Sequence, residues 1–233
     1  MRLTTLVVAA VVSQMAGAPA PAAEELKMSP VLRALMSIQG EAFVPPAQNE
    51  SLQALLRQHP KLDFFEMCGV GDARQVREAL QVDAALARSW HPIGWSALHF
   101  AAFSGDVDTV TLLLDRGAVI DARAHTRFLN TPLQAALLSG QISTARVLIE
   151  RGADVLMRQQ GGFAPIHEAA LLGRRDLVDV LLAAGAEINA RANDGRTPVS
   201  EALRGGHPEL AEYLRSRGGT DAKLVADVTK SPN

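Results

Sequence analysis

The sequence predicts an all-α solenoid, in which helix–turn–helix units stack in a row and are joined by short hairpin fingers. The first observation is a glycine that recurs at nearly constant spacing, as Gly105, Gly140, Gly173 and Gly206. A second glycine follows each of these at the same spacing, as Gly117, Gly152, Gly185 and Gly218. Apolar residues three and four positions apart lie between the two glycines, which is the period of a helix buried on one face. A repeat of this length predicts a supersecondary unit that buries its apolar face against the next unit.

The first helix of each unit is predicted from the segment that precedes the first glycine. The four segments read Gly94-Trp-Ser-Ala-Leu-His-Phe-Ala-Ala-Phe-Ser-Gly105, Asn130-Thr-Pro-Leu-Gln-Ala-Ala-Leu-Leu-Ser-Gly140, Phe163-Ala-Pro-Ile-His-Glu-Ala-Ala-Leu-Leu-Gly173 and Arg196-Thr-Pro-Val-Ser-Glu-Ala-Leu-Arg-Gly-Gly206. One position is always alanine, which lets neighbouring helices approach closely. The closing glycine can adopt the left-handed conformation that ends a helix without a steric penalty.

The second helix of each unit is predicted from a stripe of apolar residues. Positions five, eight and nine after the glycine share one helical face. They are Val110, Leu113 and Leu114, then Ala145, Leu148 and Ile149, then Val178, Leu181 and Leu182, and finally Ala211, Leu214 and Arg215. The same offsets from Gly71, which precedes Gly105 by 34 residues, give Val76, Ala79 and Leu80. A degenerate unit capped by Asp63 is therefore predicted before the others.

These motifs resemble the ankyrin repeat, whose unit is a turn followed by two helices. The resemblance covers about residues 62–219 and implies five units, at about 62–90, 91–123, 124–158, 159–191 and 192–219. Arg215 is charged where the other units are aliphatic, and we interpret it as the end of the stack, where no further unit follows. The link 122–130 carries two extra residues and predicts a longer finger. The resemblance also implies that His99 and His167 have a structural hydrogen-bonding role.

The regions outside the repeats have different patterns. Residues 1–23 combine Arg2, a short apolar run and an alanine-rich end, which predicts a bacterial secretory signal peptide cleaved near Ala22 or Ala23. The alternative is an uncleaved anchor, but the apolar run is only about half the ~20 residues of a membrane-spanning helix. Residues 24–61 predict two short helices, from Ser29 and from Ser51, that cap the first unit. Residues 220–233 have no strong pattern, and we expect them to be disordered.

Composition and motifs argue against several functional classes. The net charge of −2 gives no electrostatic support for a nucleic-acid partner. Cys68 is the single cysteine, which excludes an internal disulfide, and we expect it to be a small buried side chain. The six histidines form no metal-ligand pattern, and we find no nucleophile elbow or phosphate-binding glycine loop. We therefore expect no catalytic residue, metal or cofactor.

Candidate protein-binding residues come from the positions that vary between units. The resemblance places recognition at the hairpin tips and at the exposed side of the first helices. These positions carry many apolar and aromatic residues, which are typical of interfaces. The candidates are Trp95, Phe100, Phe103, Asn130, Leu138, Phe163, Glu168, Leu171 and Arg196. The alternative is that residues 24–61 or the C-terminal tail cover this stripe, or that some of these side chains lie in the core.

The sequence thus predicts a non-enzymatic protein-binding module that acts in the periplasm, or is secreted, through its concave face and hairpin tips. We expect a monomer with a protein partner and no membrane contact after signal cleavage. One alternative is an assembly or stabilising factor for an exported enzyme. Another is an enzyme with a small-molecule site where the long finger meets the N-terminal segment. Repeats specify the scaffold and do not identify the partner.

Overall fold

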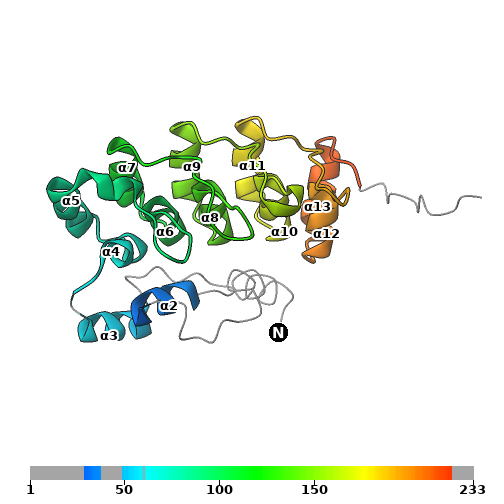
Figure 1. The fold of residues 1–233 in the computed structure, drawn as a ribbon. Helices are drawn as coiled ribbons and strands as arrows, with labels where there is room; N and C mark the ends of the chain where they lie inside the picture. The colour runs from blue at the N-terminus through cyan, green and yellow to red at the C-terminus, as the bar shows by residue number, and fades with distance from the viewer. Residues whose placement is uncertain (1–28, 38–48, 60, 222–233) are drawn as a thin grey trace, which may run out of the picture. The chain divides into compact units, whose positions relative to one another are not determined.

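The computed structural model describes residues 29–37, 49–59 and 61–221, and the predicted signal peptide lies outside these ranges. The described residues form twelve α-helices and no strand, with one isolated β-bridge between Trp90 and Ser96. Five pairs of helices follow one another along the chain after two N-terminal helices (Figure 1). The predicted all-α repeat solenoid is therefore confirmed.

The chain divides into two compact parts, Met1–Asp154 and Val155–Asn233. From here on these are called the first unit and the second unit, and each pair of helices is called a repeat. The first unit holds the pairs α4 and α5, α6 and α7, and α8 and α9, at Phe64–Val70, Ala73–Val82, Ala97–Ser104, Val107–Asp115, Pro132–Leu138 and Ile142–Glu150. The first helices α4, α6 and α8 pack side by side, and so do the second helices α5, α7 and α9 (Figure 1). A 3₁₀ helix, η2 (Ala84–Arg88), follows α5.

The second unit holds two further pairs. They are α10 (Pro165–Leu171) with α11 (Arg175–Ala183), and α12 (Pro198–Arg204) with α13 (Pro208–Ser216). The short 3₁₀ helix η3 (Gln160–Gly162) precedes α10, and α10 packs against both α11 and α12. The two first helices of this unit are therefore in direct contact, as they are in the first unit.

Short polar caps explain where the first helices begin. In α4 the carboxylate of Asp63 accepts from the Glu66 amide at 2.8 Å, and Glu66 accepts in return from the Asp63 amide at 2.7 Å. The same reciprocal pattern joins Thr131 with Gln134 at the start of α8. Each box satisfies two amide groups that the helix itself leaves without a partner.

The first helices are buried on almost every side. All eight residues of α6 are buried, and so are the first six of α8 and of α10. The recurring alanines are fully inaccessible, which fits their predicted role in close helix packing: Ala101, Ala136, Ala169 and Ala202. These helices are buried because each is sandwiched between its pair partner and the neighbouring first helix.

The second helices bury the predicted stripe with one difference. The fifth and eighth positions after the glycine are buried from α7 onward, whereas the ninth is half-buried in Leu114, Ile149 and Leu182. In α5 the buried pair is Val76 and Leu80 instead. Arg215 is half-buried like its equivalents and pairs with Glu212 and Asp221. The aliphatic residues at the ninth position and Arg215 are therefore equally half-buried. The charge of Arg215 is paired with the carboxylates of Glu212 and Asp221.

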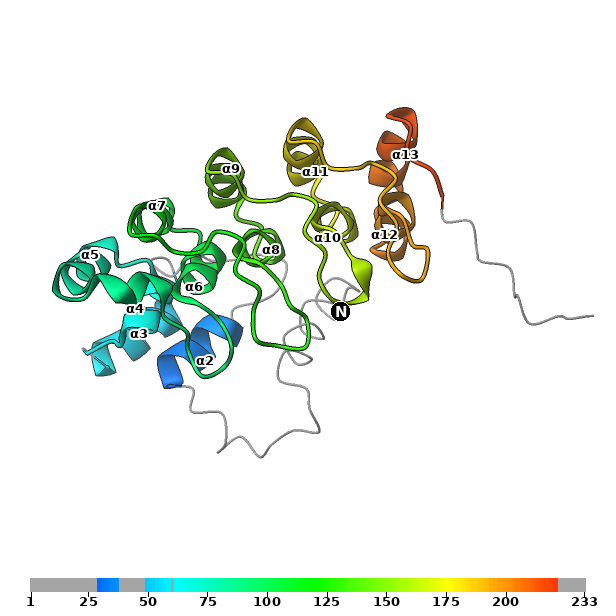
Figure 2. The ribbon, with the colours of Figure 1, turned by 45° about the horizontal axis from the view of Figure 1, so that its top comes forward.

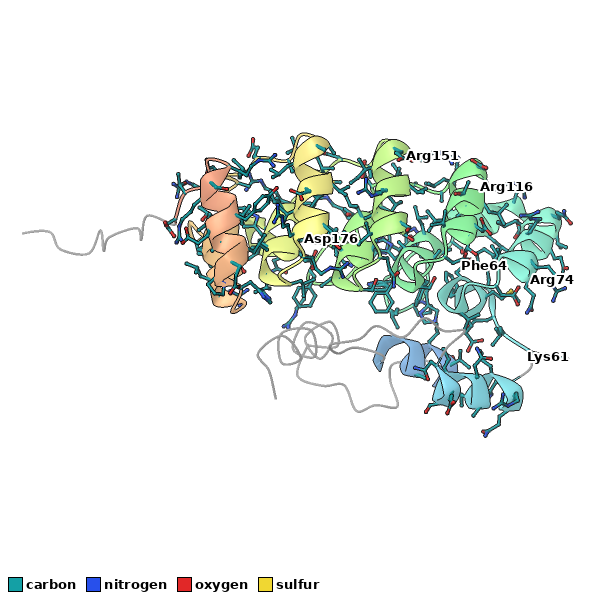
Figure 3. All side chains as sticks on the ribbon, turned by 180° about the vertical axis from the view of Figure 1, so that it is seen from behind. Lys61, Phe64, Arg74, Arg116, Arg151 and Asp176 are labelled. Carbon is teal, nitrogen blue, oxygen red and sulfur yellow. The ribbon has the colours of Figure 1, made fainter. Side chains whose placement is uncertain are left out.

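Arginines that follow the second helices also reach back to the preceding pair. Arg116, after α7, donates to the carbonyl oxygen of Leu80 at 3.3 Å, and Arg151, after α9, forms an ion pair with Asp115. Both arginines lie at the ends of neighbouring second helices (Figure 3). These contacts connect successive pairs within the first unit on the side formed by the second helices.

Two N-terminal helices precede the repeats, close to the ranges that the sequence predicts. They are α2 (Pro30–Ser37) and α3 (Glu50–Gln58), and α2 packs against both α3 and α4. Val31, Leu32 and Leu52 are buried in this contact region. The hydroxyl of Ser29 donates to the carboxylate of Glu66, which ties the start of α2 to the start of α4. The contact places the start of α2 beside the first repeat.

The first two residues of the predicted tail contact the last pair of helices. Thr220, which we expected to begin a disordered tail, donates from its amide to Asn189 at 2.7 Å and accepts from the Thr197 hydroxyl at 2.8 Å. Asp221 pairs with Arg215. These two residues complete the last pair of helices, and the rest of the predicted tail lies outside the described residues.

Candidate functional site

Three of the predicted binding residues form a buried aromatic cluster in the first unit. Trp95, Phe100 and Phe103 are only 1%, 2% and 7% exposed. The ring of Trp95 lies 5.3 Å from that of Phe100 and 5.6 Å from that of Phe103, both in edge-to-face contact. The prediction that they are exposed anchors is wrong, because Trp95, which precedes α6, packs on Phe100 and Phe103 of α6, and Phe100 also contacts Phe65 on α4. The apolar surface that these three rings bury stabilises the core of the first unit.

The buried residue Asn130 is also misplaced by the sequence prediction. Its backbone carbonyl accepts from Nε2 of His99 at 3.0 Å, and Nδ1 of His99 accepts from the Ser96 amide at 3.2 Å. Burial lowers the pKa of His99 to about 4, so the ring is neutral at physiological pH. Asn130 is 1% exposed, and this bridge joins two successive repeats within the first unit. It belongs to the interior and is not a hairpin-tip contact.

The same bridge recurs in the second unit. Nδ1 of His167 accepts from the Ala164 amide at 3.1 Å, and Nε2 lies 3.2 Å from the carbonyl oxygen of Arg196. The pKa of His167 is lowered, mainly by burial. The structural hydrogen-bonding role implied for both histidines is therefore confirmed.

The predicted long finger, residues 122–130, projects from the first unit between α7 and α8 (Figure 2). Its base is held by two backbone hydrogen bonds of 2.8 Å, from Ala124 to Asn130 and from His125 to Gly94. Gly94 has φ +91°, and a Cβ there would lie 2.7 Å from the His125 carbonyl oxygen. The His125 ring stacks on Trp90 with centroids 3.8 Å apart. The finger base is therefore rigidly positioned.

The finger tip presents an apolar side chain at a backbone cost. Leu129 has φ +56°, the one positive φ among the described residues other than glycine, and its side chain is 40% exposed. Beside it the guanidinium of Arg127 lies 4.8 Å from the ring centroid of Phe128. A left-handed conformation costs an L-residue about 1–2 kcal/mol, so a leucine here is unexpected on local grounds. Sequence reasoning missed Leu129, although the two extra residues of the link indicated the finger.

The second unit brings four predicted or adjacent residues together. The guanidinium of Arg196 lies 4.6 Å from the ring centroid of half-buried Phe163, and its NH1 is 3.0 Å from Oε1 of Glu201. Glu201 is 1% exposed, and its Oε2 also accepts from NH2 of Arg204 at 2.6 Å. The candidates Phe163 and Arg196 therefore remain partly accessible, and the Arg196 guanidinium contacts both the Phe163 ring and a buried carboxylate.

The other three candidates differ in their exposure. Leu138 in the first unit and Leu171 in the second are half-buried. Glu168 is 7% exposed, so the prediction that it is an exposed contact is wrong. It is buried because its helix, α10, is enclosed by α11 and α12. Burial raises the pKa of Glu168 to about 8.

The side chains that could bind a metal ion do not gather in the part of the chain that the structure describes. The described residues contain no cluster of three or more metal-ligating side chains, and none of their helices is long and apolar enough to cross a membrane. Cys68 is fully buried, as expected, and burial strongly raises the pKa of its thiol. An open cleft of about 410 Å³ lies between α3 and the turn after α4, lined by residues that include Leu56, His59 and Asp72. No finger residue lines this cleft.

Paired helices that stack through buried alanines, with histidine bridges between successive pairs, define a helical repeat protein. A family model described as ankyrin repeats in three copies matches residues 64–159, 119–192 and 156–226. The chain belongs to the ankyrin repeat family, which is generally non-enzymatic and indicates a protein–protein interaction module. A search of curated proteins found no significant match.

Proposed function

We propose that this ankyrin repeat protein is an exported, non-enzymatic module that binds a partner protein in the periplasm. Each compact unit has its own corrected contact surface: the first has the finger tip at residues 127–129, and the second has Phe163, Leu171, Arg196 and Arg204. The family supports protein binding, and the finger supports the position of the contact.

The observation that carries the proposal is the conformation of Leu129. An exposed apolar side chain gains little for the fold, and a left-handed backbone at leucine is unfavourable. Strained residues of this kind cluster at ligand-binding sites, where the surrounding structure holds them. The finger base holds Leu129 in place through the hydrogen bonds of Ala124 and His125. A partner contact gives a physical reason for placing leucine at this position.

The test replaces Leu129 by glycine, which accepts the same backbone conformation without a side chain. We expect the variant Leu129→Gly to keep or increase its free energy of unfolding. We expect its capture of proteins from a periplasmic extract to fall about tenfold for the specific partner, as for loss of an interface anchor. Quantitative mass spectrometry of the captured proteins measures the change.

The matched control is Val119→Ala, because Val119 is an exposed aliphatic residue of the same unit, 58% accessible, outside the finger. This variant should capture the same proteins in the same amounts as the wild type. If Leu129→Gly and Val119→Ala behave alike, the finger tip is not a binding surface. A protein whose capture is lost only in Leu129→Gly identifies the partner.

The proposed location depends on the first 23 residues. Their single basic residue, apolar run and alanine-rich end support export and cleavage. Expression of the full chain in a bacterial host, followed by cell fractionation and mass spectrometry of the purified protein, tests the proposal. A periplasmic product that begins at residue 23 or 24 supports it, and an uncut cytoplasmic product contradicts it.

A further inference from the structure

The second unit contains a buried carboxyl oxygen without a hydrogen-bond partner. Oε2 of Glu168 is inaccessible and receives no hydrogen bond from any of residues 29–37, 49–59 and 61–221. Glu168 lies at the middle of α10 and is 7% exposed. Burying a carboxyl group without a partner is costly, and such groups in native structures call for an explanation.

The chain itself shows how the same position is satisfied one repeat later. Glu201 occupies in α12 the place that Glu168 occupies in α10, directly after the residue that caps the helix through its side chain. Glu201 is also buried, but two guanidinium groups hold it, with Arg196 on Oε1 and Arg204 on Oε2. A carboxylate at this repeat position is therefore compatible with burial when arginines reach both of its oxygens.

The residues that supply those arginines differ around Glu168. Arg196 stands five residues before Glu201 and Arg204 three residues after it, whereas Phe163 and Leu171 stand at these distances from Glu168. Neither can neutralise a carboxylate. Phe163 is moreover a ring on which a guanidinium already rests, since Arg196 lies 4.6 Å from its centroid. At the two sequence positions that supply arginines to Glu201, the repeat of Glu168 thus has an aromatic and an apolar side chain and lacks the cation.

We propose that Glu168 receives an arginine side chain of the partner protein, which supplies the guanidinium that Arg196 and Arg204 supply to Glu201. This inference rests on the proposed function and names the chemistry of its partner. Arginine fits better than lysine, because a guanidinium stays charged when it is desolvated beside a buried carboxyl group, whereas a lysine ammonium readily loses its proton there. Leu171 and Leu172, three and four residues after Glu168, are half-buried and flank the site on the helix.

The experiment selects peptides from a random displayed library against the full chain. Wild type, Glu168→Gln and Glu209→Gln are compared, because Glu209 is an exposed glutamate of the same unit and its change removes the same charge. We expect wild type and Glu209→Gln to enrich peptides with an arginine at a constant position. Glu168→Gln should lose this enrichment and bind a selected peptide about tenfold more weakly. Replacing the arginine of that peptide by lysine should weaken its binding to wild type.

Two further measurements separate binding from folding. Thermal unfolding should show that Glu168→Gln is as stable as wild type or more stable, because an amide replaces a buried carboxyl group. In wild type, NMR of the glutamate carboxyl carbons should show that the selected peptide lowers the pKa of Glu168. An unchanged pKa would overturn the inference.

The possible failures are distinct. Peptides that bind wild type without an enriched arginine, or with an arginine that Glu168→Gln still selects, refute the role of Glu168 and leave the proposed function standing. Enriched lysine in place of arginine refutes the guanidinium site. If wild type selects no peptide and Leu129→Gly captures the same proteins as wild type, the proposed function fails and this inference fails with it.

Discussion

The hydroxyl of Ser29 donates a hydrogen bond to Glu66, so one glutamate connects the start of α2 with the start of the first repeat. The other carboxylate oxygen of Glu66 accepts from the Asp63 amide at 2.7 Å and caps α4. Ser29 also accepts from the Leu32 amide at 3.1 Å and so begins α2. A single side chain thus connects a helix outside the repeat motif to the repeats.

We expect Ser29→Ala to lower the free energy of unfolding by about 1 kcal/mol, because it removes a helix cap and leaves a buried carboxylate with one partner fewer. Chemical denaturation of the full chain measures the change. Ser51→Ala is the control, since Ser51 is an exposed residue within α3. A loss of equal size in both variants would show that the Ser29 contact contributes nothing specific.

The pair formed by Arg196 and Glu201 gives a larger expected effect. Arg196→Ala should destabilise the protein by roughly 3 kcal/mol, because removing one partner leaves a buried carboxylate incompletely compensated. The double variant Arg196→Ala with Glu201→Gln should recover part of this loss. Arg146→Ala, at an exposed arginine on α9, should change stability by less than about 0.5 kcal/mol. Urea denaturation compares the four proteins, and no recovery in the double variant would argue against the coupling.

Glu168 should make stability depend on pH in a defined window. Burial raises its pKa from an ordinary 4.5 to about 8 in the folded chain. The folded state therefore binds the proton of Glu168 more tightly than the unfolded state does. The contribution of this proton to the free energy of unfolding is fully present below pH 4.5 and is lost as pH rises through about 8. We expect wild type to lose stability relative to Glu168→Gln between these values. Melting curves of both proteins from pH 4 to 9 measure the difference. If the stability of the two proteins depends on pH in the same way, Glu168 does not have the raised pKa.

The bridge made by His99 should tolerate one polar replacement better than an apolar one. His99→Ala removes the acceptor of the Ser96 amide and the donor to the Asn130 carbonyl, so we expect a loss of about 2–4 kcal/mol. Gln134 forms the equivalent cap in α8, where its Oε1 accepts from the Thr131 amide at 2.9 Å. His99→Gln should therefore lose less than His99→Ala. Equal losses would indicate that ring packing, and not hydrogen bonding, is the main contribution.

The fold was predictable because it depends on local and repeated features. Each repeat buries the same small and aliphatic positions, so the spacing of glycines, alanines and leucines reports the architecture directly. The degenerate first repeat was recognisable for the same reason, through Gly71 and the apolar residues that follow it. The helix from Ser29 was predictable from its own cap and from the proline that follows it.

The binding residues were less predictable because exposure depends on neighbours that are distant in sequence. Trp95, Phe100 and Phe103 have the composition of an interface, and only their mutual packing shows that they belong to the core. Leu129 gives no local signal, since its left-handed backbone is imposed by a finger anchored to Gly94. The long link indicated where to look but not which residue is presented.

The sequence by itself determined that this chain is a stack of ankyrin repeats, because stacking requires the same residue types at the same spacing in every repeat. Only the tertiary structure decided which variable positions are buried, which are presented and which carboxylates have partners. Glu168 and Glu201 are the same residue at the same repeat position, but only the folded chain shows that Arg196 and Arg204 contact Glu201 and that Oε2 of Glu168 has no partner among the described residues. Burial and charge compensation are properties of contacts between segments, which a repeat motif does not encode.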